Sequence, residues 1–398
     1  MISFLAISGA LLTLAAGTAG QPVDPPAAPG AMGPNLVATG GTLLLSWLEP
    51  LRPGGRPGEG DLALRYAIFD GTRWSVARTI LSGPKFFANW ADFPAIASAS
   101  PGWLLAAWPE RSGAGDYDYN MELARAASAG GPWRRVGPAH EDDTQAEHGF
   151  VSLVPEGEAI RAFWLDGRNM KGDKGSMSLR TARIGERPEP SQLLDARVCD
   201  CCQTAAAVTS EGSIVVYRDR SDEEIRDISI IRRSGGEWTA PRSVAEDHWK
   251  IGGCPVNGPA VAASGKRVGV AWFTAEGERP RVRMAFSKDA GASFGKPVEV
   301  DGAGSAGRVG IVLEDGGGAI VCFVAAEGNA AAIRVRRVGP DGRAGAPLSI
   351  ASTSLARSSG VPRIARYRDT LVVAWVDAGE PFRLRASSVP LVAIPRPE

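Results

Sequence analysis

The sequence lacks an excess of charge of either sign. It contains 44 Lys and Arg residues against 44 Asp and Glu residues, so its formal net charge at pH 7 is zero. Net charge therefore draws this chain neither to nucleic acid nor to an anionic membrane surface. We expect no nucleic-acid partner, we expect a small-molecule or glycan ligand, and we leave a protein partner open.

Long apolar runs are absent after the first 20 residues. Residues 1–20 form an uncharged, largely apolar segment that ends in small residues, which is typical of a signal peptide. We expect this segment to be removed, residues 21–33 to form a Pro-rich lead-in, and the mature protein to be periplasmic or secreted. No later segment offers the roughly 18 consecutive apolar residues of a membrane helix, so we expect a protein that does not span the membrane.

Helical periodicity is missing as well, whereas glycine and proline are plentiful, at 49 and 29 residues. Short apolar runs separated by turn residues dominate instead, which indicates an all-β protein. One such run, which ends near an aromatic residue, recurs at intervals of 51 to 61 residues. The seven aromatic residues are Trp47, Trp108, Trp164, Tyr217, Trp272, Phe323 and Trp375.

Each of these seven units contains about four short strands, which is the content of one propeller blade. First strands are expected, for example, at residues 94–98, 258–264 and 362–368. We therefore predict a single β-propeller domain over residues 34–394 with seven four-stranded blades. A six-bladed propeller of the sialidase type is the alternative.

One turn motif indicates a family. The segment SKDAGASF at residues 287–294 matches the pattern S-x-D-x-G-x-x-aromatic, and its Gly-to-aromatic spacing recurs at residues 71–74, 130–133 and 235–238. On these residues the chain resembles the Asp-box (BNR repeat) propellers of the sialidase-like superfamily. We expect the motif to be a structural turn, in which Ser and Asp bond the local backbone and Gly supplies a positive φ.

Blade topology sorts the polar residues by face. The loop before a first strand, which we call the approach loop, and the loop after a second strand open on the same mouth of the central channel. All three histidines (His140, His148 and His248) and four of the five cysteines fall in three successive approach loops. The sequence therefore predicts a ligand site on this mouth, built chiefly by blades 2–5.

Three interpretations stay open for the thiols of Cys199, Cys201, Cys202 and Cys254. A disulfide from Cys254 to one of the other three would staple neighbouring blades of an exported protein. A thiolate site completed by His148 or His248 would suit a soft or borderline ion such as Cu(I) or Zn(II). The third interpretation is a reactive cysteine whose pKa is lowered by a nearby Arg or Lys.

The resemblance to sialidases implies an arginine triad that holds a substrate carboxylate, a tyrosine nucleophile, and a carboxyl group that acts as acid or base. Arg111, Arg168 and Arg220 all follow second strands on the predicted mouth and could form the triad. Tyr117 is the candidate nucleophile, and Asp219 is a candidate catalytic carboxylate.

Further residues of the same mouth are candidates for ligand binding. They lie in the approach loops of blades 4 and 5 and in the charged loop of blade 4: Asp200, Arg218, Asp222, Arg226, Trp249, Lys250 and Asn257. Three functions stay open. They are a propeller that binds a ligand beside a Cys-rich site, a glycoside hydrolase of the exo-α-sialidase type that acts on acidic glycans, and a protein-interaction scaffold.

Overall fold

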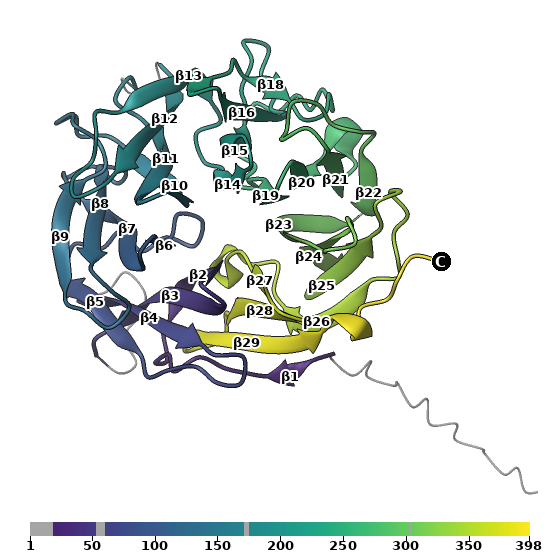
Figure 1. The fold of residues 1–398 in the computed structure, drawn as a ribbon, viewed down its shortest axis with the longest axis horizontal. Coiled ribbons are helices and arrows are strands. Elements are labelled where there is room, and N and C mark those ends of the chain that lie inside the picture. Colours follow the sequence, from purple (N-terminus) through teal and green to yellow (C-terminus); the bar gives the residue numbers. More distant parts are fainter. Residues whose placement is uncertain (1–18, 53–59, 171–174, 303) are drawn as a thin grey trace, which may run out of the picture.

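The computed structural model describes residues 19–52, 60–170, 175–302 and 304–398. Most of the predicted signal peptide, residues 1–18, lies outside the described residues. The described chain forms seven antiparallel sheets arranged as blades around a central channel (Figure 1). The prediction of an all-β, seven-bladed propeller is therefore confirmed, and the six-bladed alternative is wrong.

The first four blades run from the innermost to the outermost strand in chain order. Blade 1 holds β2 (Met32–Thr39), β3 (Thr42–Pro50), β4 (Leu62–Phe69) and β5 (Arg78–Gly83). Blade 2 holds β6 (Ala95–Ala99), β7 (Trp103–Arg111), β8 (Tyr119–Ala126) and β9 (Trp133–Pro138). Blade 3 holds β10 (His148–Glu156), β11 (Ala159–Asp166), β12 (Met177–Ile184) and β13 (Gln192–Val198). Blade 4 holds β14 (Ala205–Thr209), β15 (Gly212–Arg218), β16 (Ile228–Ser234), β17 (Glu237–Trp238) and β18 (Arg242–Ser243).

The remaining blades follow the same order. Blade 5 holds β19 (Ala260–Ser264), β20 (Arg267–Thr274), β21 (Arg281–Ser287) and β22 (Val298–Asp301). Blade 6 holds β23 (Ser305–Leu313), β24 (Ala319–Glu327), β25 (Ala330–Val338) and β26 (Leu348–Thr353). Blade 7 holds β27 (Arg363–Tyr367), β28 (Thr370–Asp377) and β29 (Arg383–Pro390). Short 3₁₀ turns lie at Glu276–Glu278, Arg357–Ser359 and Leu391–Ala393. Among the described residues, no helix is long and apolar enough to cross a membrane.

The ring is closed by the N-terminal segment. Strand β1 (Gln21–Pro22) pairs with β29, with Gln21 opposite Ser388, so it supplies the outermost strand of blade 7. The first strand of blade 1 begins at Met32. The segment expected to be a lead-in at residues 21–33 is thus built into the propeller.

The recurring aromatic residues all lie on second strands and pack between blades. Six of the seven are buried, and Trp375 is half-buried. In blades 1–3 the indole N–H of the tryptophan donates to a carboxylate two residues later, as in the 2.9 Å bond from Trp164 to Asp166. Residues i and i+2 of a strand share a face, which explains the recurring W-x-E/D pattern.

The turn at residues 287–294 has the hydrogen bonds expected of it. The Ser287 hydroxyl accepts from the backbone N–H of Gly291 at 2.9 Å, and Asp289 accepts from the N–H of Ser293 at 2.9 Å. Ala290 and Gly291 both have a positive φ, at 57° and 84°. The motif therefore serves as a turn between β21 and β22.

The innermost strands of blades 3 and 6 carry a bulge where they enter the channel. Phe150 and Arg308 sit in these bulges with φ of 56° and 55°, a conformation that non-glycine residues rarely adopt. Each turns its backbone N–H toward the preceding blade. Phe150 donates to Asp92 at 2.9 Å, and Arg308 donates to Asn257 at 2.7 Å. Strained backbone of this kind is often found at functional sites.

Candidate functional site

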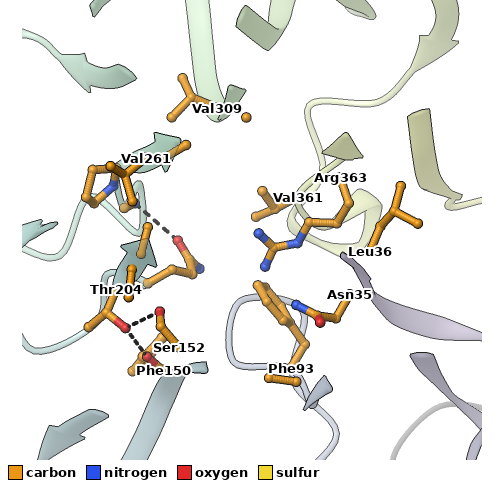
Figure 2. Close-up of a pocket in the computed structure, with 18 of the residues that line it drawn as sticks. Asn35, Leu36, Phe93, Phe150, Ser152, Thr204, Val261, Val309, Val361 and Arg363 are labelled. Carbon is orange, nitrogen blue, oxygen red and sulfur yellow. Dashed lines mark hydrogen bonds between the residues drawn. The ribbon is translucent and has the colours of Figure 1, made fainter. Parts of the chain in front are cut away.

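The first strands and approach loops of all seven blades line a cavity of about 210 Å³ (Figure 2). Pockets for drug-sized ligands measure roughly 300–1,000 Å³, so this cavity suits a group about the size of one sugar ring. Most of its lining is apolar. Its polar residues are Asn35, Asp92, Ser152, Gln203, Thr204, Arg308 and Arg363.

Arg363 projects into this cavity (Figure 2). Its guanidinium lies 4.0 Å from the centre of the Phe93 ring, and its Nε donates to the carbonyl of Pro34 at 3.3 Å. Within the described residues, Nη1 and Nη2 have no hydrogen-bond acceptor. Burial lowers the pKa of Arg363 to about 10, so the group is still cationic at neutral pH. Two unused NH₂ groups on a half-buried cation favour an anionic ligand.

Arg308 brings a second positive charge to the cavity wall. Its guanidinium donates to the hydroxyl of Ser359 at 2.6 Å and to nearby backbone carbonyls, and burial lowers its pKa. Among the described residues, no carboxylate forms an ion pair with Arg308. Because the protein already uses its donors, Arg308 contributes positive potential more than a free hydrogen-bonding group.

A phenol joins two carboxyl groups beside the cavity. The hydroxyl of Tyr119 lies 2.7 Å from Asp92 Oδ2 and 2.8 Å from Glu147 Oε1. Tyr119 is fully buried, and Phe87 stacks on its ring at 4.3 Å. Gly149 leaves room for the pair, because a Cβ at this position would lie 1.9 Å from Asp92 Oδ2.

This geometry requires a protonated carboxyl group. A phenol has one proton to donate, and an ionised carboxylate only accepts hydrogen bonds. If both contacts are hydrogen bonds, either Asp92 or Glu147 must carry a proton. Burial is the main cause that raises the pKa of each carboxyl group to about 7, and the charge of Asp92 contributes to the raised pKa of Glu147. Asp92 also accepts from the Phe150 N–H, which favours its ionised form, so we assign the proton to Glu147.

Four thiols meet near the edge of the same mouth. The Sγ atoms of Cys199, Cys201 and Cys202 lie within 4.8 Å of one another, and Cys254 lies close enough to this group for Cys199 to raise its pKa. The approach loops of blades 4 and 5 thus bring together the four cysteines that the sequence assigned to one mouth. All are free thiols in this structure. The hydrogen bonds from the other three thiols lower the pKa of Cys199, which makes it the thiolate of the group.

Two buried arginines flank the thiols. Arg226 Nη1 lies 3.3 Å from Cys199 Sγ, and Arg226 also pairs with Glu224 at 2.8 Å. Arg218 is 1% exposed, and its guanidinium donates to backbone carbonyls, including those of Asn257 and Phe273. The thiols therefore lie in a positively charged environment, which favours thiolates.

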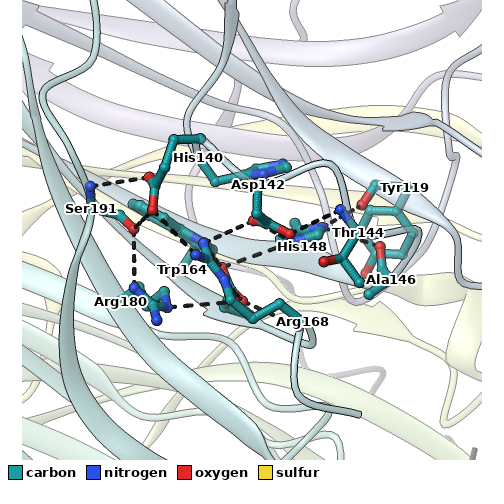
Figure 3. A network of polar contacts seen from close by, with 12 residues as sticks. Tyr119, His140, Asp142, Thr144, Ala146, His148, Trp164, Arg168, Arg180 and Ser191 are labelled. Atoms are coloured by element: carbon teal, nitrogen blue, oxygen red, sulfur yellow. Dashed lines mark hydrogen bonds and ion pairs between the residues drawn. The ribbon is translucent and has the colours of Figure 1, made fainter. Parts of the chain in front are cut away.

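His148 lies in a different group of residues from the one predicted. Its ring stacks on that of His140, with 3.8 Å between the ring centres, and its Nε2 lies 3.4 Å from Asp142 Oδ2 (Figure 3). The guanidinium of Arg168 lies 2.9 Å from both Asp142 Oδ2 and Asp166 Oδ2. Arg168 contacts both carboxylates and Arg180 lies 4.0 Å from Asp166, so these residues form an ion-pair network that surrounds His148, separate from the cysteines. We therefore remove His148 from the set of ligands expected beside the cysteines.

The predicted arginine triad offers few free donors. Arg168 is engaged in the network of Figure 3. Arg220 pairs with Asp200 at 3.1 Å and with Glu224 at 2.8 Å. Arg111 is exposed and lies over the ring of Phe87 at 5.2 Å. A carboxylate clamp needs unused N–H groups, and among the described residues only the Arg111 guanidinium of this triad lacks a hydrogen-bond acceptor.

The two other predicted catalytic residues lie in different surroundings. Tyr117 is 60% exposed, and its described contact is a tilted approach to Phe87. Among the described residues, no carboxylate hydrogen-bonds to its hydroxyl, whereas two carboxyl groups contact the hydroxyl of Tyr119. Asp219 accepts from the Ser229 hydroxyl at 2.9 Å, and burial raises its pKa. These bonds tie Asp219 to the start of β16, and it does not line the cavity.

The seven predicted ligand-binding residues serve mainly to hold loops together. Trp249 is buried beneath the guanidinium of Arg218, at 4.9 Å, and is not available for stacking on a sugar. Asn257 accepts the N–H of Arg308 through its side chain. Lys250 is exposed. The others are occupied by contacts within the protein: Asp200, Arg218, Asp222 and Arg226.

Sequence reasoning missed three charged residues that line the cavity or lie beside it. Asp92, Glu147 and Arg363 lie in an approach loop or at the start of a first strand, as the topological argument requires. Asp92 lies three residues before β6, and Arg363 is the first residue of β27. Listing every charged residue within three positions of a first strand would have found all three.

No family model matches the chain, and no curated protein matches it. Several solved structures share its fold. An α-L-arabinofuranosidase from Fusarium graminearum is 13% identical with a TM-score of 0.52, covering 95% of this chain and 99% of that one. An α-L-arabinanase from Penicillium chrysogenum, bound to arabinobiose, is 12% identical with a TM-score of 0.52, covering 95% and 100%. The endosialidase of phage phi92 is 10% identical with a TM-score of 0.51, covering 94% and 69%. At such identities the likeness establishes the fold alone.

Proposed function

We propose that this chain hydrolyses a terminal, carboxylate-bearing sugar from a glycan at the mouth of the propeller channel. The observation that carries the proposal is the group of Asp92, Tyr119 and Glu147, in which one carboxyl group must hold a proton. A protonated acid beside an ionised carboxylate is the pair that glycoside hydrolysis requires. The glycan-acting names of three structural neighbours support the same reaction class.

The roles follow from the hydrogen bonds. Glu147 donates its proton to the oxygen of the leaving group, and Asp92, which lines the cavity, supplies the ionised carboxylate. Tyr119 is a positioning residue that holds both groups. The two carboxyl oxygens that contact the Tyr119 hydroxyl can be at most about 5.5 Å apart, which is too close for the water of an inverting glycosidase, so we expect retention of configuration at the anomeric carbon.

The positive charge of the cavity wall favours a sugar that carries a carboxylate. Arg363 offers two free N–H donors, and Arg308 adds positive charge on the same wall. Phe93, on which Arg363 stacks, is the neighbour of Asp92 in the chain. A sugar carboxylate bound by Arg363 would thus lie close to the acid pair. The small cavity favours a single terminal residue over the interior of a chain.

A panel of fluorogenic glycosides tests the proposal. It contains a sialoside, a glucuronide and a galacturonide as acidic substrates, and an arabinofuranoside as a neutral one. We expect turnover of an acidic glycoside, with kcat/KM lowered about 10²- to 10⁴-fold by Glu147→Gln. Arg363→Gln should lower kcat/KM for the acidic substrate by roughly tenfold to a hundredfold, mainly through KM.

The matched control is Glu122→Gln. Glu122 is also a buried carboxyl group with a raised pKa, but it pairs with Arg135 and does not line the cavity. This variant should keep wild-type turnover. Failure of the wild type to release any acidic sugar, or unchanged turnover by Glu147→Gln, would overturn the proposal.

A further inference from the structure

We propose that Cys199, Cys201, Cys202 and Cys254 bind one thiophilic d¹⁰ metal ion, Zn(II) or Cu(I). The site lies between the approach loops of blades 4 and 5. It does not depend on the proposed glycan chemistry, because none of the four thiols lines the channel cavity.

The sulfur positions match a coordination sphere. The Sγ atoms of Cys199 and Cys202 are 3.7 Å apart. Two thiolates bound to zinc at about 2.3 Å with tetrahedral angles would be separated by about 3.8 Å. A disulfide needs an S–S distance of about 2.05 Å. The three sulfurs of blade 4 are therefore already spaced to share one ion.

The surrounding charges also favour thiolates. Among the described residues, Arg218 forms no ion pair with a carboxylate, although it is 1% exposed. Its donors go to the neutral carbonyls of Arg226, Asn257 and Phe273. A buried cation without a carboxylate partner is costly unless another anion compensates it. Thiolates of the cluster are the anions available, and Arg226 directly contacts one of them, Cys199.

The fourth ligand, Cys254, lies on the side from which an ion can enter the site from solvent. Cys199 and Cys202 are buried and Cys201 is half-buried, whereas Cys254 is exposed. Cys254 follows Gly252 and Gly253, whose Cβ positions face open space. A loop of this kind can move the Cys254 thiol aside and close it over a bound ion. Soft thiolate ligands select Cu(I) and Zn(II) over hard cations such as Mg²⁺ and Ca²⁺.

Metal binding by the full chain tests the site. The reduced protein is titrated anaerobically with Zn(II) alone and with Cu(I) alone, and bound metal is measured by mass spectrometry after desalting. We expect one ion per chain in at least one titration. Each thiol that binds as a thiolate gives up its proton, so the Zn(II) titration should release protons. Replacement by Co(II) should produce intense thiolate-to-cobalt charge-transfer bands.

Two Cys→Ala variants separate binding from folding. Cys254→Ala alters an exposed loop, so the chain should fold, and it should bind the metal at least tenfold more weakly. Cys322→Ala changes a buried cysteine in the sixth blade, away from the cluster, and should bind like the wild type. The proposal is overturned if the reduced wild-type protein takes up neither ion, or if Cys254→Ala binds as tightly as the wild type.

Discussion

At the scale of single residues, the most informative feature is the single proton that Tyr119 can donate. Two carboxyl groups lie within hydrogen-bond distance of its hydroxyl, so one of them must supply a proton of its own. Burial favours this protonated form, because it disfavours the ionised form of each carboxyl group. A buried neutral acid of this kind is a recurrent part of catalytic sites.

The protonated state of Glu147 predicts a pH-dependent stability. Its pKa is about 7 in the folded protein against 4.5 for an ordinary glutamate. The contribution of Glu147 is therefore fully present below about pH 4.5 and is lost as the pH rises toward about 7. Relative to Glu147→Gln, the wild type should lose on the order of 3 kcal/mol of unfolding free energy over this range. Urea unfolding at several pH values measures the difference, and identical pH dependence in both proteins would contradict the assignment.

At the scale of elements, the bulged first strands of blades 3 and 6 repeat one construction. Asp92 and Asn257 each lie three residues before the first strand of their blade. Each accepts the N–H of the bulged residue in the next blade, Phe150 or Arg308. The amide of Asn257 shows that this contact does not need a charge. The contact alone does not require the carboxyl group of Asp92, which fits the catalytic role proposed for it.

The comparison between these blades predicts different outcomes for two substitutions. Asp92→Asn keeps an oxygen for the Phe150 N–H and should fold with near wild-type stability. Asp92→Ala leaves that buried N–H without its partner and should cost about 1–3 kcal/mol. Both variants should lose glycoside turnover. Equal destabilisation by the two substitutions, measured by urea unfolding, would show that the Phe150 contact is not what holds the loop.

At the scale of the whole molecule, the ring is closed by residues from both ends of the described chain. Strand β1 pairs with β29, the carbonyl of Val23 accepts the indole N–H of Trp74 at 2.6 Å, and Asp24 pairs with Arg385 at 2.7 Å. A chain that begins at Pro25 should therefore lose several kcal/mol of stability, at roughly 1 kcal/mol for each lost hydrogen bond. A chain that begins at Gln21 is the control. Equal thermal unfolding of the two would contradict this account of ring closure.

The blades could be predicted from the sequence because each is a local unit. The aromatic residue of a second strand, such as Trp164, and the acid two positions later are set by strand geometry alone. The pattern alone does not show that Asp166 accepts the Trp164 N–H. Sequence pattern does not reveal which partner a carboxylate takes.

The propeller topology predicts which loops lie together at the site, but it does not predict the contacts of individual side chains. The topology predicted that Cys254 lies near the other three cysteines, although more than 50 positions separate it from them in the sequence. It could not show that Tyr119 rather than Tyr117 meets carboxylates, because the two lie two positions apart and differ only in burial. It also could not show that Arg168 and Arg220 are held by ion pairs whereas Arg363 has free donors.

The pH dependence of kcat/KM on the best acidic glycoside tests the central claim most directly. If Glu147 is the proton donor, the wild-type rate should fall as the pH rises through about 7, because the acid loses its proton. This decline should be abolished in Glu147→Gln together with most of the activity, and Glu122→Gln should retain it. A rate that stays constant through pH 7 in the wild type, or the same decline in Glu147→Gln, would contradict the account.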